Sequence, residues 1–478
     1  MSLAAGAIVS DGEDVASVLL RAIAVASPAR ADFYSLATTT GVESYPSPPQ
    51  FPGIKGSTAL AHKLVRVEPN DTPQPLYQGT QAVTFLGRLA DGDPGSLVLA
   101  DYVRGNGRDG LMRLLKERRG PYAAVVAEEG RLLCCRDVLG VVPLYYGFSD
   151  ALACVASNMR TIRYMGLEPK RAEPGRLYEL RPGSYTETEV ARLWRPKEDH
   201  LSLDEAVDGL CVRLMRAAER AIGANPYLVL AFSGGIDSTL LALHLDRAGA
   251  RLLLSCVAAE GSKDAEAAET SADAMGLPLR VRTVTERDVE GALDAVLSSI
   301  EEANPVKVGV ALPLYFVAEG SVSEGRRVVV SGNMSDELFG GYARYANQYA
   351  SEGGGAVLET MFRDVERSYE SNFERDWEVC ADLGVELRAP YADHDLVDYA
   401  LSLPLEVKLP EGGPRKVVLR RLASKLGLPD DVSGRPKKAA QYSSGVQKIL
   451  ERLARREGMI LSGYLSRRME ALRAGGSF

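Results

Sequence analysis

The segment that most constrains the fold is the run YLVLAFSGGIDSTLLALHL at residues 227–245. An apolar stretch of strand length passes through two glycines directly into a segment of helical character. Glycines let consecutive backbone N–H groups approach an anion, and a helix N-terminus adds unsatisfied donors and partial positive charge. The segment therefore predicts a strand, a phosphate-binding loop and a helix. The alternative interpretation is a tight strand-to-helix turn in which Asp237 is only a cap.

Strands and helices alternate on either side of this loop up to about residue 330. A helix-start signal precedes the alternation, because Ser202 is followed three residues later by Glu205, the pattern of a capping box. Apolar strands that alternate with helices are typical of a parallel sheet covered by helices on both faces. We expect helices to about 222 and at 238–248, 264–275 and 288–302, strands at YLVLAF, RLLLSCV, LRVRTV and RVVVSG, and a helical remainder that ends in an Arg-rich segment at 446–473.

The first 195 residues have a different character. Helical periodicity occurs at 12–26 and 108–118, but short strand-like segments dominate, among them GAIVS, AHKLVRVE, AVTFLG, YAAVVA and RLLCCRD. A chain of 478 residues also exceeds what one hydrophobic core usually organises. We therefore predict two domains, a strand-rich layered α/β domain at 1–195 and a parallel-sheet domain at 200–478.

Charge and the rarer residues exclude several classes of protein. A net charge of -8 and a pI near 5.4 give no general attraction to nucleic acid or to an anionic membrane. The start MSLAAGAIVSDGEDV lacks the basic flank and apolar run of a signal peptide, so we expect a cytoplasmic protein. Six cysteines without C-x-x-C spacing and only four histidines indicate mostly buried thiols and no zinc or iron site. Any catalytic metal is expected on carboxylates.

The residues of the loop indicate the kind of phosphate chemistry. The Walker pattern, which ends in Gly-Lys-Ser or Gly-Lys-Thr, is absent. Asp237 beside phosphates is unfavourable unless a cation such as Mg²⁺ intervenes. A second strand and loop, VVVSGNMSDELFGGY at 328–342, carries Asp336 and Glu337. Because loops at the carboxyl ends of parallel strands line one crevice, we predict that Asp237 and Asp336 share Mg²⁺.

A third segment, RPKKAAQY at 435–442, carries two adjacent lysines between helices. Lysine there could neutralise the charge that develops on departing pyrophosphate, as cationic groups do in phosphoryl chemistry. Taken alone, Lys437 and Lys438 are better explained as a solvated surface pair. Their combination with the two acidic loops favours the first interpretation.

The three segments together resemble the synthetase domain of the glutamine-dependent asparagine synthetase family, whose Ser-Gly-Gly-x-Asp-Ser loop is that of the ATP-pyrophosphatases. The resemblance covers nearly the whole chain and indicates an archaeal-like or divergent member. It implies an N-terminal-nucleophile-hydrolase-like α-β-β-α sandwich at 1–195, a glutaminase-like domain, followed by an ATP-pyrophosphatase domain at 200–478. The other segments that carry it are GPYAAVVA, RDVLGVVPLYYG, VASNMRTI and EPGRLYEL in the first domain, and 368–393 and 415–432 in the second.

The resemblance also implies ATP and Mg²⁺ as cofactors and a set of site residues. In this family a substrate carboxylate attacks the α-phosphate of ATP, and an amine then displaces AMP from the acyl-adenylate to give an amide. Asp237 and Asp336 would hold Mg²⁺, Lys437 would contact pyrophosphate, and these three form the implied catalytic set. The implied ATP-binding residues are Ser233, Gly234, Gly235, Asp237 and Ser238 at the phosphates and Ala231, Val257, Ser331 and Gly332 at the nucleoside.

The first domain departs from the family pattern where glutamine would be hydrolysed. The family requires an N-terminal cysteine followed by glycine, but the alignable stretch begins Ala5-Gly6, and no cysteine precedes position 134. The oxyanion segment reads Leu86-Gly87-Arg88, and a leucine side chain cannot donate an oxyanion hydrogen bond. The His-x-Arg-Leu segment reads His62-Lys63-Leu64. Ser2 lies off register as a substitute nucleophile. We predict that this domain is inactive.

The second domain departs from the family pattern at one position. Asparagine synthetases commonly have Ser-Gly-Glu-Gly-x-Asp-Glu, whereas this chain has Asn333 in place of the first glutamate, the family's candidate base for the amine. An asparagine side chain cannot accept a proton as a base. It could still orient an amine, and Glu301 or Glu302 could supply the base.

These observations leave three functions open. The first is an amide-forming ligase of asparagine biosynthesis that uses a small carboxylate, aspartate by default, and ammonia in place of glutamine. The second is a cyclase that resembles β-lactam synthetase, or a ligase for another amine. The third is an inactive nucleotide-binding regulatory protein, which would not need the metal pair. The partners expected are small molecules, not nucleic acid or membrane, and a homodimer is left open.

Overall fold

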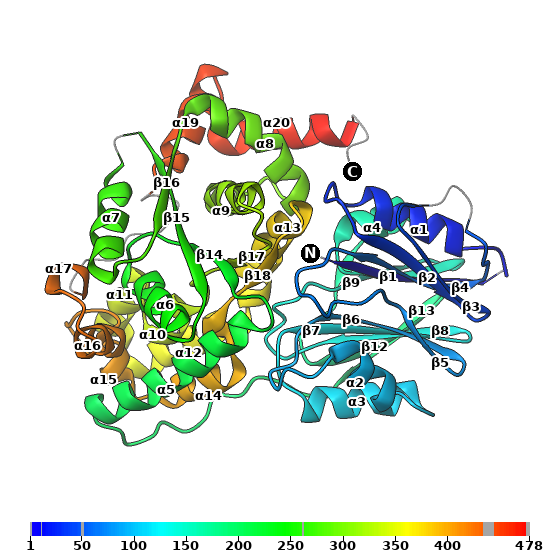
Figure 1. The fold of residues 1–478 in the computed structure, drawn as a ribbon, viewed down its shortest axis with the longest axis horizontal. Coiled ribbons are helices and arrows are strands. Elements are labelled where there is room, and N and C mark those ends of the chain that lie inside the picture. Colours follow the sequence, from blue (N-terminus) through cyan, green and yellow to red (C-terminus); the bar gives the residue numbers. More distant parts are fainter. Residues whose placement is uncertain (1, 11, 49–51, 261, 434–443, 475–478) are drawn as a thin grey trace. The chain divides into compact units, whose positions relative to one another are not determined.

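The computed structural model describes residues 2–10, 12–48, 52–260, 262–433 and 444–474 (Figure 1). The chain divides into two compact units. The first contains the residues up to Leu193 together with Ala381–Gly384, and the second runs from Trp194 to Cys380 and onward from Val385. Each unit has its own sheets and its own apolar core, so the two are described in turn.

Two antiparallel sheets form the middle of the first unit. One has the strand order β11-β9-β10-β1-β4-β2-β3 and the other the order β13-β12-β8-β7-β6-β5. The strands are β1 (Leu3–Val9), β2 (Phe33–Thr38), β3 (Gly41–Tyr45), β4 (Thr58–Leu64), β5 (Leu76–Gln78), β6 (Gln81–Gly87), β7 (Tyr122–Glu128), β8 (Arg131–Arg136), β9 (Tyr145–Phe148), β10 (Leu152–Ala156), β11 (Lys170–Arg171), β12 (Arg176–Arg181) and β13 (Ser184–Glu189).

Helices cover the outer faces of the two sheets. Helices α1 (Ala16–Val25) and α4 (Met159–Tyr164) pack on the first sheet, and α2 (Gly95–Tyr102) and α3 (Gly107–Glu117) pack on the second. The sheets face each other through β1, β4 and β10 on one side and β6, β7 and β8 on the other. The predicted α-β-β-α sandwich is therefore confirmed, and its four layers can be followed in Figure 1.

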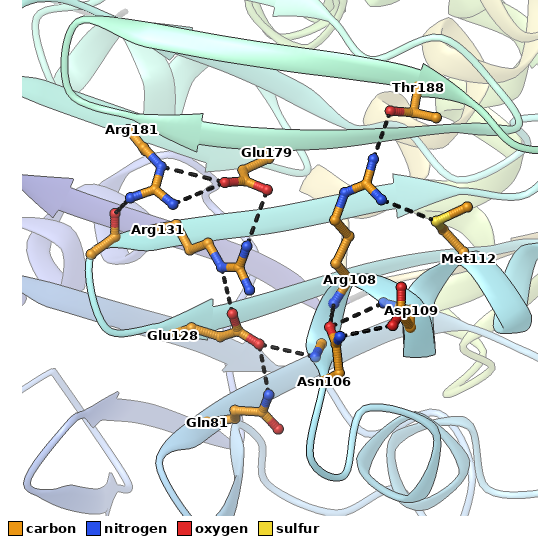
Figure 2. Close-up of polar contacts among 12 residues, drawn as sticks. Gln81, Asn106, Arg108, Asp109, Met112, Glu128, Arg131, Glu179, Arg181 and Thr188 are labelled. Atoms are coloured by element: carbon orange, nitrogen blue, oxygen red, sulfur yellow. Dashed lines mark hydrogen bonds and ion pairs between the residues drawn. The ribbon is translucent and has the colours of Figure 1, made fainter.

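A polar network joins the strands of the second sheet to the start of α3 (Figure 2). The Arg131 guanidinium bridges Glu128 on β7 and Glu179 on β12, at 2.6 and 3.2 Å. Glu128 also accepts hydrogen bonds from the Gln81 amide at 2.6 Å and from the Gly107 backbone N–H at 3.0 Å. One carboxylate thus connects β6, β8 and the first residue of α3. These groups are partly exposed, so they align the strands more than they stabilise the fold.

A five-stranded parallel sheet forms the centre of the second unit. Its order is β16-β15-β14-β17-β18, and every adjacent pair is parallel, which confirms the predicted parallel sheet. The apolar residues that fill the strand positions are buried because helices cover both faces. The strands are β14 (Tyr227–Ala231), β15 (Arg251–Ala259), β16 (Leu279–Val284), β17 (Val328–Val330) and β18 (Glu386–Arg388).

Helices surround this sheet. Helices α6 and α7 contact it on one side, with α5 and α16 packed on α6, and α9 contacts it with α8 and α19 behind (Figure 1). The predicted capping box is present, since the Ser202 hydroxyl and the Glu205 carboxylate each accept a hydrogen bond from the other's backbone N–H. The helices up to residue 366 are α5 (Leu203–Ile222), α6 (Ile236–Arg247), α7 (Lys263–Met275), α8 (Glu286–Ile300), α9 (Pro305–Ser323), α10 (Ser335–Phe339), α11 (Ala343–Glu352) and α12 (Gly354–Glu366).

The rest of the second unit is mainly helical, as expected from the sequence. A π-helical turn, η1 (Tyr369–Phe373), leads directly into α13 (Glu374–Asp382), and a 3₁₀ turn, η2 (Pro390–Ala392), precedes α14. The predicted Arg-rich segment at 446–473 forms two helices. The remaining helices are α14 (His394–Ser402), α15 (Leu405–Lys408), α16 (Val417–Lys425), α17 (Asp430–Ser433), α19 (Val446–Arg456) and α20 (Leu461–Ala474).

Helix α9 is not predicted from the sequence and belongs to the core. Within the described residues it is the one helix long and apolar enough to cross a membrane, judged by length and composition. It packs on β14, β15 and β17, and half of its apolar window is buried in the unit. Burial between the sheet and α8 accounts for its apolar character. The cysteines agree with the sequence prediction, because five of the six are buried.

Candidate functional site

The predicted phosphate loop lies between β14 and α6. Gly234 has a left-handed backbone (φ +66°), and a Cβ there would lie 2.3 Å from the Ala267 carbonyl oxygen of α7, so only glycine fits. Gly235 is the N-cap of α6, and the Ser238 hydroxyl donates a 3.1 Å hydrogen bond to its carbonyl oxygen. The loop therefore has the tight backbone and the helix N-terminus that phosphate binding requires.

The second acidic loop lies beside the first. It follows β17, which is hydrogen-bonded to β14, so the two loops leave adjacent strands at the same edge of the sheet. The Ser335 hydroxyl donates a 2.9 Å hydrogen bond to Oδ1 of Asp237, and Gly332 approaches the Asp237 side chain closely. The structure thus brings the Asp237 and Asp336 loops together.

Lys416 lies between the two carboxylates, and its position is not predicted from the sequence. Its Nζ is 2.6 Å from an oxygen of Asp237 and 2.6 Å from Oδ1 of Asp336. The lysine side chain is 1% exposed, and the two aspartates are 12% and 16% exposed. A buried ammonium group is tolerable here because two carboxylates surround it. Lys416 lies in the segment 415–432 that carries part of the family resemblance, but nothing in RKVVLRRLASK distinguishes it from the other basic residues there.

Further basic groups and one glycine surround the charged triad, which consists of Lys416, Asp237 and Asp336. Arg415 donates a 2.6 Å hydrogen bond to the Gly341 carbonyl oxygen, and Arg420 donates one of 2.9 Å to the Arg415 carbonyl oxygen. Burial lowers the pKa of Arg420, the nearby Arg415 lowers it further, and the charge of Asp237 opposes both. A Cβ on Gly341 would overlap Oδ1 of Asp336 and crowd Cε of Lys416. The triad therefore depends on glycine at this position.

The donor set fits a divalent cation of the oxygen-binding kind. Asp237 and Asp336 both reach the same ammonium nitrogen, so one cation of similar position can contact both carboxylates. Carboxylate oxygens are the protein ligands that Mg²⁺ prefers. The Tyr391 hydroxyl, whose pKa is raised by burial, donates a 3.1 Å hydrogen bond to the Asp237 carbonyl oxygen and fixes the first turn of α6.

The residues predicted to contact the nucleoside line the carboxyl ends of three neighbouring strands. Ala231 ends β14, Val257 lies near the end of β15, and Ser331 and Gly332 follow β17. The Ser331 hydroxyl is buried and has no hydrogen-bond partner among the described residues. Buried hydroxyls usually have a hydrogen-bond partner. The Ser331 hydroxyl is therefore available to bind a ligand.

Lys437 and Lys438 lie outside the described residues. The described chain resumes at Ser444, whose carbonyl oxygen accepts a 2.7 Å hydrogen bond from the Ala259 N–H at the end of β15. Ser444 is therefore at the carboxyl edge of the sheet, where the phosphate loop also lies. The role of Lys437 stays a prediction.

Asn333 has a partner that the sequence does not reveal. Its amide nitrogen donates a 2.6 Å hydrogen bond to Asp376, which also forms a two-point ion pair with Arg375. Asp376 thus places a carboxylate within hydrogen-bond distance of the position where the family has a base. The two glutamates considered from the sequence lie at the end of α8, where Glu301 is buried and Glu302 pairs with Lys307 at 2.7 Å.

Glu337, next to Asp336, is part of a separate buried group. It accepts hydrogen bonds from the Tyr342 hydroxyl at 2.8 Å and from the Asn372 amide at 2.9 Å. Burial is the largest effect on Glu337 and raises the pKa of this carboxyl, and the charge of Asp336 acts in the same direction.

In the first unit, the positions aligned with the glutaminase site hold apolar or unpaired groups. Ala5 is in the middle of β1, and its side chain belongs to the apolar cluster beneath α1. Leu86 is buried in β6. Both ring nitrogens of His62 are buried without a hydrogen-bond partner among the described residues, and burial lowers the pKa of His62 to about 3. Ser2 accepts a 3.1 Å hydrogen bond from the Val65 N–H.

Curated relatives and solved structures resemble the chain to different degrees. A provisionally named glutamine-hydrolysing asparagine synthetase 1 of Methanocaldococcus jannaschii is 29% identical, over 72% of either chain. The glutamine-hydrolysing asparagine synthetase 1 of Lotus japonicus is 27% identical, over 82% of this chain and 71% of that one. Two solved structures are more distant, and we draw no conclusion from their TM-scores. They are a glutamine phosphoribosylpyrophosphate amidotransferase of B. subtilis (TM-score 0.35, 14% identity, 58% and 65% covered) and an NH3-dependent NAD synthetase of Campylobacter jejuni (TM-score 0.26, 16% identity, 57% and 97% covered).

A family model that matches the second unit identifies the family of this chain. The model of the asparagine synthase family matches residues 212–377 and 349–474, which together span more than half of the chain. This region contains the phosphate loop, the second acidic loop and Lys416. The chain therefore belongs to the asparagine synthase family, as the sequence resemblance indicates, and is an ATP-dependent ligase that forms carbon–nitrogen bonds.

Proposed function

We propose that this protein adenylates a small carboxylate with ATP, releases pyrophosphate, and forms an amide with ammonia, with aspartate as the default substrate. The observation that carries the proposal is the pair Asp237 and Asp336 at one edge of the parallel sheet, beside a glycine loop that opens α6. Asp237 and Asp336 would hold Mg²⁺, which would neutralise charge on the phosphates and orient them. The protein's own contribution is positioning and charge stabilisation.

Individual residues support the nucleotide part of the proposal. The loop from Ser233 to Ser238 offers backbone N–H groups and hydroxyls to phosphate oxygens. Ser331 offers a buried hydroxyl that has no described protein partner. Lys437 would contact the departing pyrophosphate, as the family resemblance implies. Each of these roles is a prediction for this chain.

Ammonia is proposed in place of glutamine because the first unit lacks the groups that glutamine hydrolysis needs. Acyl transfer of this kind requires an activated nucleophile and donors for the oxyanion. Ala5 and Leu86 are buried hydrocarbon side chains, and His62 has no described hydrogen-bond partner that would orient it. We therefore propose that the first unit has no glutaminase activity.

A second candidate is an amine other than ammonia, including one within the substrate itself, as in β-lactam synthetase. The observation that favours it is Asn333, whose amide donates to Asp376 and cannot take a proton from the attacking amine. Such a substrate would carry its own carboxylate and amine, so added ammonium would not accelerate it.

The test is pyrophosphate release with MgATP over a panel of amino acids, with ammonium and glutamine supplied separately. We expect release that depends on Mg²⁺ and on one carboxylate, and amide product with ammonium only. Product formation with glutamine as efficient as with ammonium would contradict the inactive first unit. If ATP binds but no carboxylate in the panel causes pyrophosphate release, the result favours the regulatory alternative.

A further inference from the structure

Lys416 occupies the position between two carboxylates that a divalent cation would occupy in the proposed reaction. Its Nζ is 2.6 Å from both oxygens of Asp237 and 2.6 Å from Oδ1 of Asp336. A lysine that formed an ordinary ion pair would contact one aspartate only. The ammonium group therefore satisfies both carboxylates at once.

The backbone holds Lys416 in this position. The residue is the N-cap of α16 and has a left-handed conformation (φ +61°), which non-glycine residues rarely adopt. Conformations of this kind persist where the surrounding structure requires them, often at functional sites. Gly341 leaves the space that the lysine stem and Asp336 need, because any side chain there would overlap them. Lys416 is thus fixed in place, unlike a flexible surface lysine.

The surrounding charges explain why a cation is needed before any ligand arrives. Two carboxylates that share one site repel each other, and one of them would take up a proton if no cation were present. Lys416 supplies the positive charge. Two further basic groups lie near the same carboxylates, since Arg415 donates to the Gly341 carbonyl oxygen and the charge of Asp237 affects the pKa of Arg420.

We infer that Lys416 is an exchangeable counter-ion. In the metal-free protein it neutralises Asp237 and Asp336 and excludes free divalent metal. When a metal–nucleotide complex binds, Lys416 leaves the carboxylates of Asp237 and Asp336, which would then hold the metal, and its ammonium group turns to a phosphate oxygen. Free metal must displace the lysine with no phosphate to receive it, so metal binding in the absence of nucleotide is weak. The inference rests on the proposed use of ATP at this site.

The experiment measures Mn²⁺ binding to the full chain without nucleotide, by electron paramagnetic resonance, in the wild type and in Lys416→Met. Removal of the competing charge is expected to tighten Mn²⁺ binding at least about tenfold, given the size of charge interactions at such distances. The metal-free variant is expected to melt at a lower temperature than the wild type, and added Mn²⁺ is expected to reverse the loss. Mn²⁺ affinity that is unchanged or weaker in the variant would overturn the inference.

Two further variants separate charge from packing. Lys416→Arg keeps the positive charge, so it should bind Mn²⁺ as weakly as the wild type, and tight binding by this variant would contradict the counter-ion role. Lys425→Met removes a half-exposed lysine that pairs with Asp208 at the other end of α16 and should change nothing. If Lys416→Met is folded only when Mn²⁺ is present, the inference is supported, whereas a variant that Mn²⁺ does not rescue overturns it.

The readout distinguishes this inference from the proposed function. Mn²⁺ binding without nucleotide does not require turnover. If Lys416→Met binds Mn²⁺ more tightly than the wild type but the wild type never releases pyrophosphate, the ligase proposal is refuted and the counter-ion role stands. A wild type that releases pyrophosphate while Lys416→Met shows no change in Mn²⁺ affinity would refute only the counter-ion role.

Discussion

The two units of this chain place their charged side chains in different ways. In the first unit, Arg131, Glu128 and Glu179 form ion pairs with side chains 13–25% exposed, at the outer face of a sheet (Figure 2). In the second unit, Lys416 is 1% exposed and contacts two carboxylates at the ends of adjacent strands. Partly exposed pairs contribute little to stability and tolerate loss, whereas a buried charge left without its partner costs several kcal/mol.

The same contrast holds between the positions aligned with the family's glutaminase site and the candidate ATP site. Where the family would hydrolyse glutamine, the first unit has Ala5, Leu86 and His62, all buried, and the His62 ring has no hydrogen-bond partner among the described residues. Where the family uses ATP, the second unit keeps a glycine loop and a compensated cluster of charges. The difference supports the proposal that the chemistry resides at the parallel sheet, with the sandwich as a folded body that has no glutaminase activity. Four variants test this contrast.

Asp237→Asn should have the largest effect. It removes one carboxylate of the proposed metal pair and leaves the Lys416 charge only half compensated. We expect pyrophosphate release to fall by about a hundredfold to a thousandfold. Asp204→Asn, which affects an exposed aspartate paired with Arg421, is the matched control and should retain full activity. Activity within a few fold of the wild type in Asp237→Asn would remove the metal assignment.

Gly341→Ala should have the next largest effect. The new Cβ would overlap Oδ1 of Asp336, so the aspartate and Lys416 must separate. We expect a free energy of unfolding lower by about 1–3 kcal/mol, as for other overpacked sites, and a raised KM for MgATP. Gly355→Ala is the control, because a Cβ at that helical position meets no other atom within 4 Å. An unchanged KM would show that the spacing of the triad does not matter.

His62→Leu should affect only the pH dependence of stability. The folded-state pKa of His62 is lowered to about 3 from 6.5, so below pH 6.5 the unfolded chain binds a proton that the folded chain does not. The folded protein is therefore destabilised as the pH falls, by up to about 1.4 kcal/mol per pH unit from this residue.

In His62→Leu this contribution should vanish. Urea unfolding followed by circular dichroism at pH 7.5, 6 and 5 is the measurement, and the exposed His200→Leu is the control. Parallel pH profiles for the wild type and His62→Leu would mean that His62 can be protonated within the fold. That result would weaken the contrast between the two sites.

Ser2→Ala should have the smallest effect. The hydroxyl accepts a hydrogen bond from the Val65 N–H, which is worth about 1 kcal/mol. We expect equal product formation with ammonium in the variant and the wild type, and none with glutamine in either. Glutamine-dependent product that is present in the wild type and lost in Ser2→Ala would identify a serine nucleophile and reverse the comparison.

The sequence predicts those parts of the fold and site that depend on local patterns. The Ser202 capping box, the strand at YLVLAF and the glycine loop before α6 depend on neighbours within a few residues, and all are present. The predicted strand AHKLVRVE is only partly correct, because β4 ends at Leu64 and the chain leaves the sheet there. Helix α9 escapes prediction because its apolar residues surround the whole helix, so no polar face marks it.

The missing parts of the site depend on contacts between distant segments. Lys416 resembles a lysine at the start of any basic helix, and its left-handed backbone leaves no local signal. Asp376 becomes relevant only because the chain brings it within hydrogen-bond distance of Asn333, 43 residues earlier. Glycine at 341 is a usable signal, since it is the second of two adjacent glycines shortly after Asp336, but its reason appears only with Lys416 in place.

The distance along the chain between the members of the charged triad has a consequence for biosynthesis. Lys416 lies 179 residues after Asp237, and both aspartates leave the ribosome before it does. The parallel sheet cannot close around two neutralised carboxylates until the start of α16 has been synthesised and docked. A nascent chain that stops before residue 416 would expose an uncompensated acidic edge, to which quality-control factors could respond. The charged triad is therefore completed only after all five strands of the parallel sheet have been synthesised.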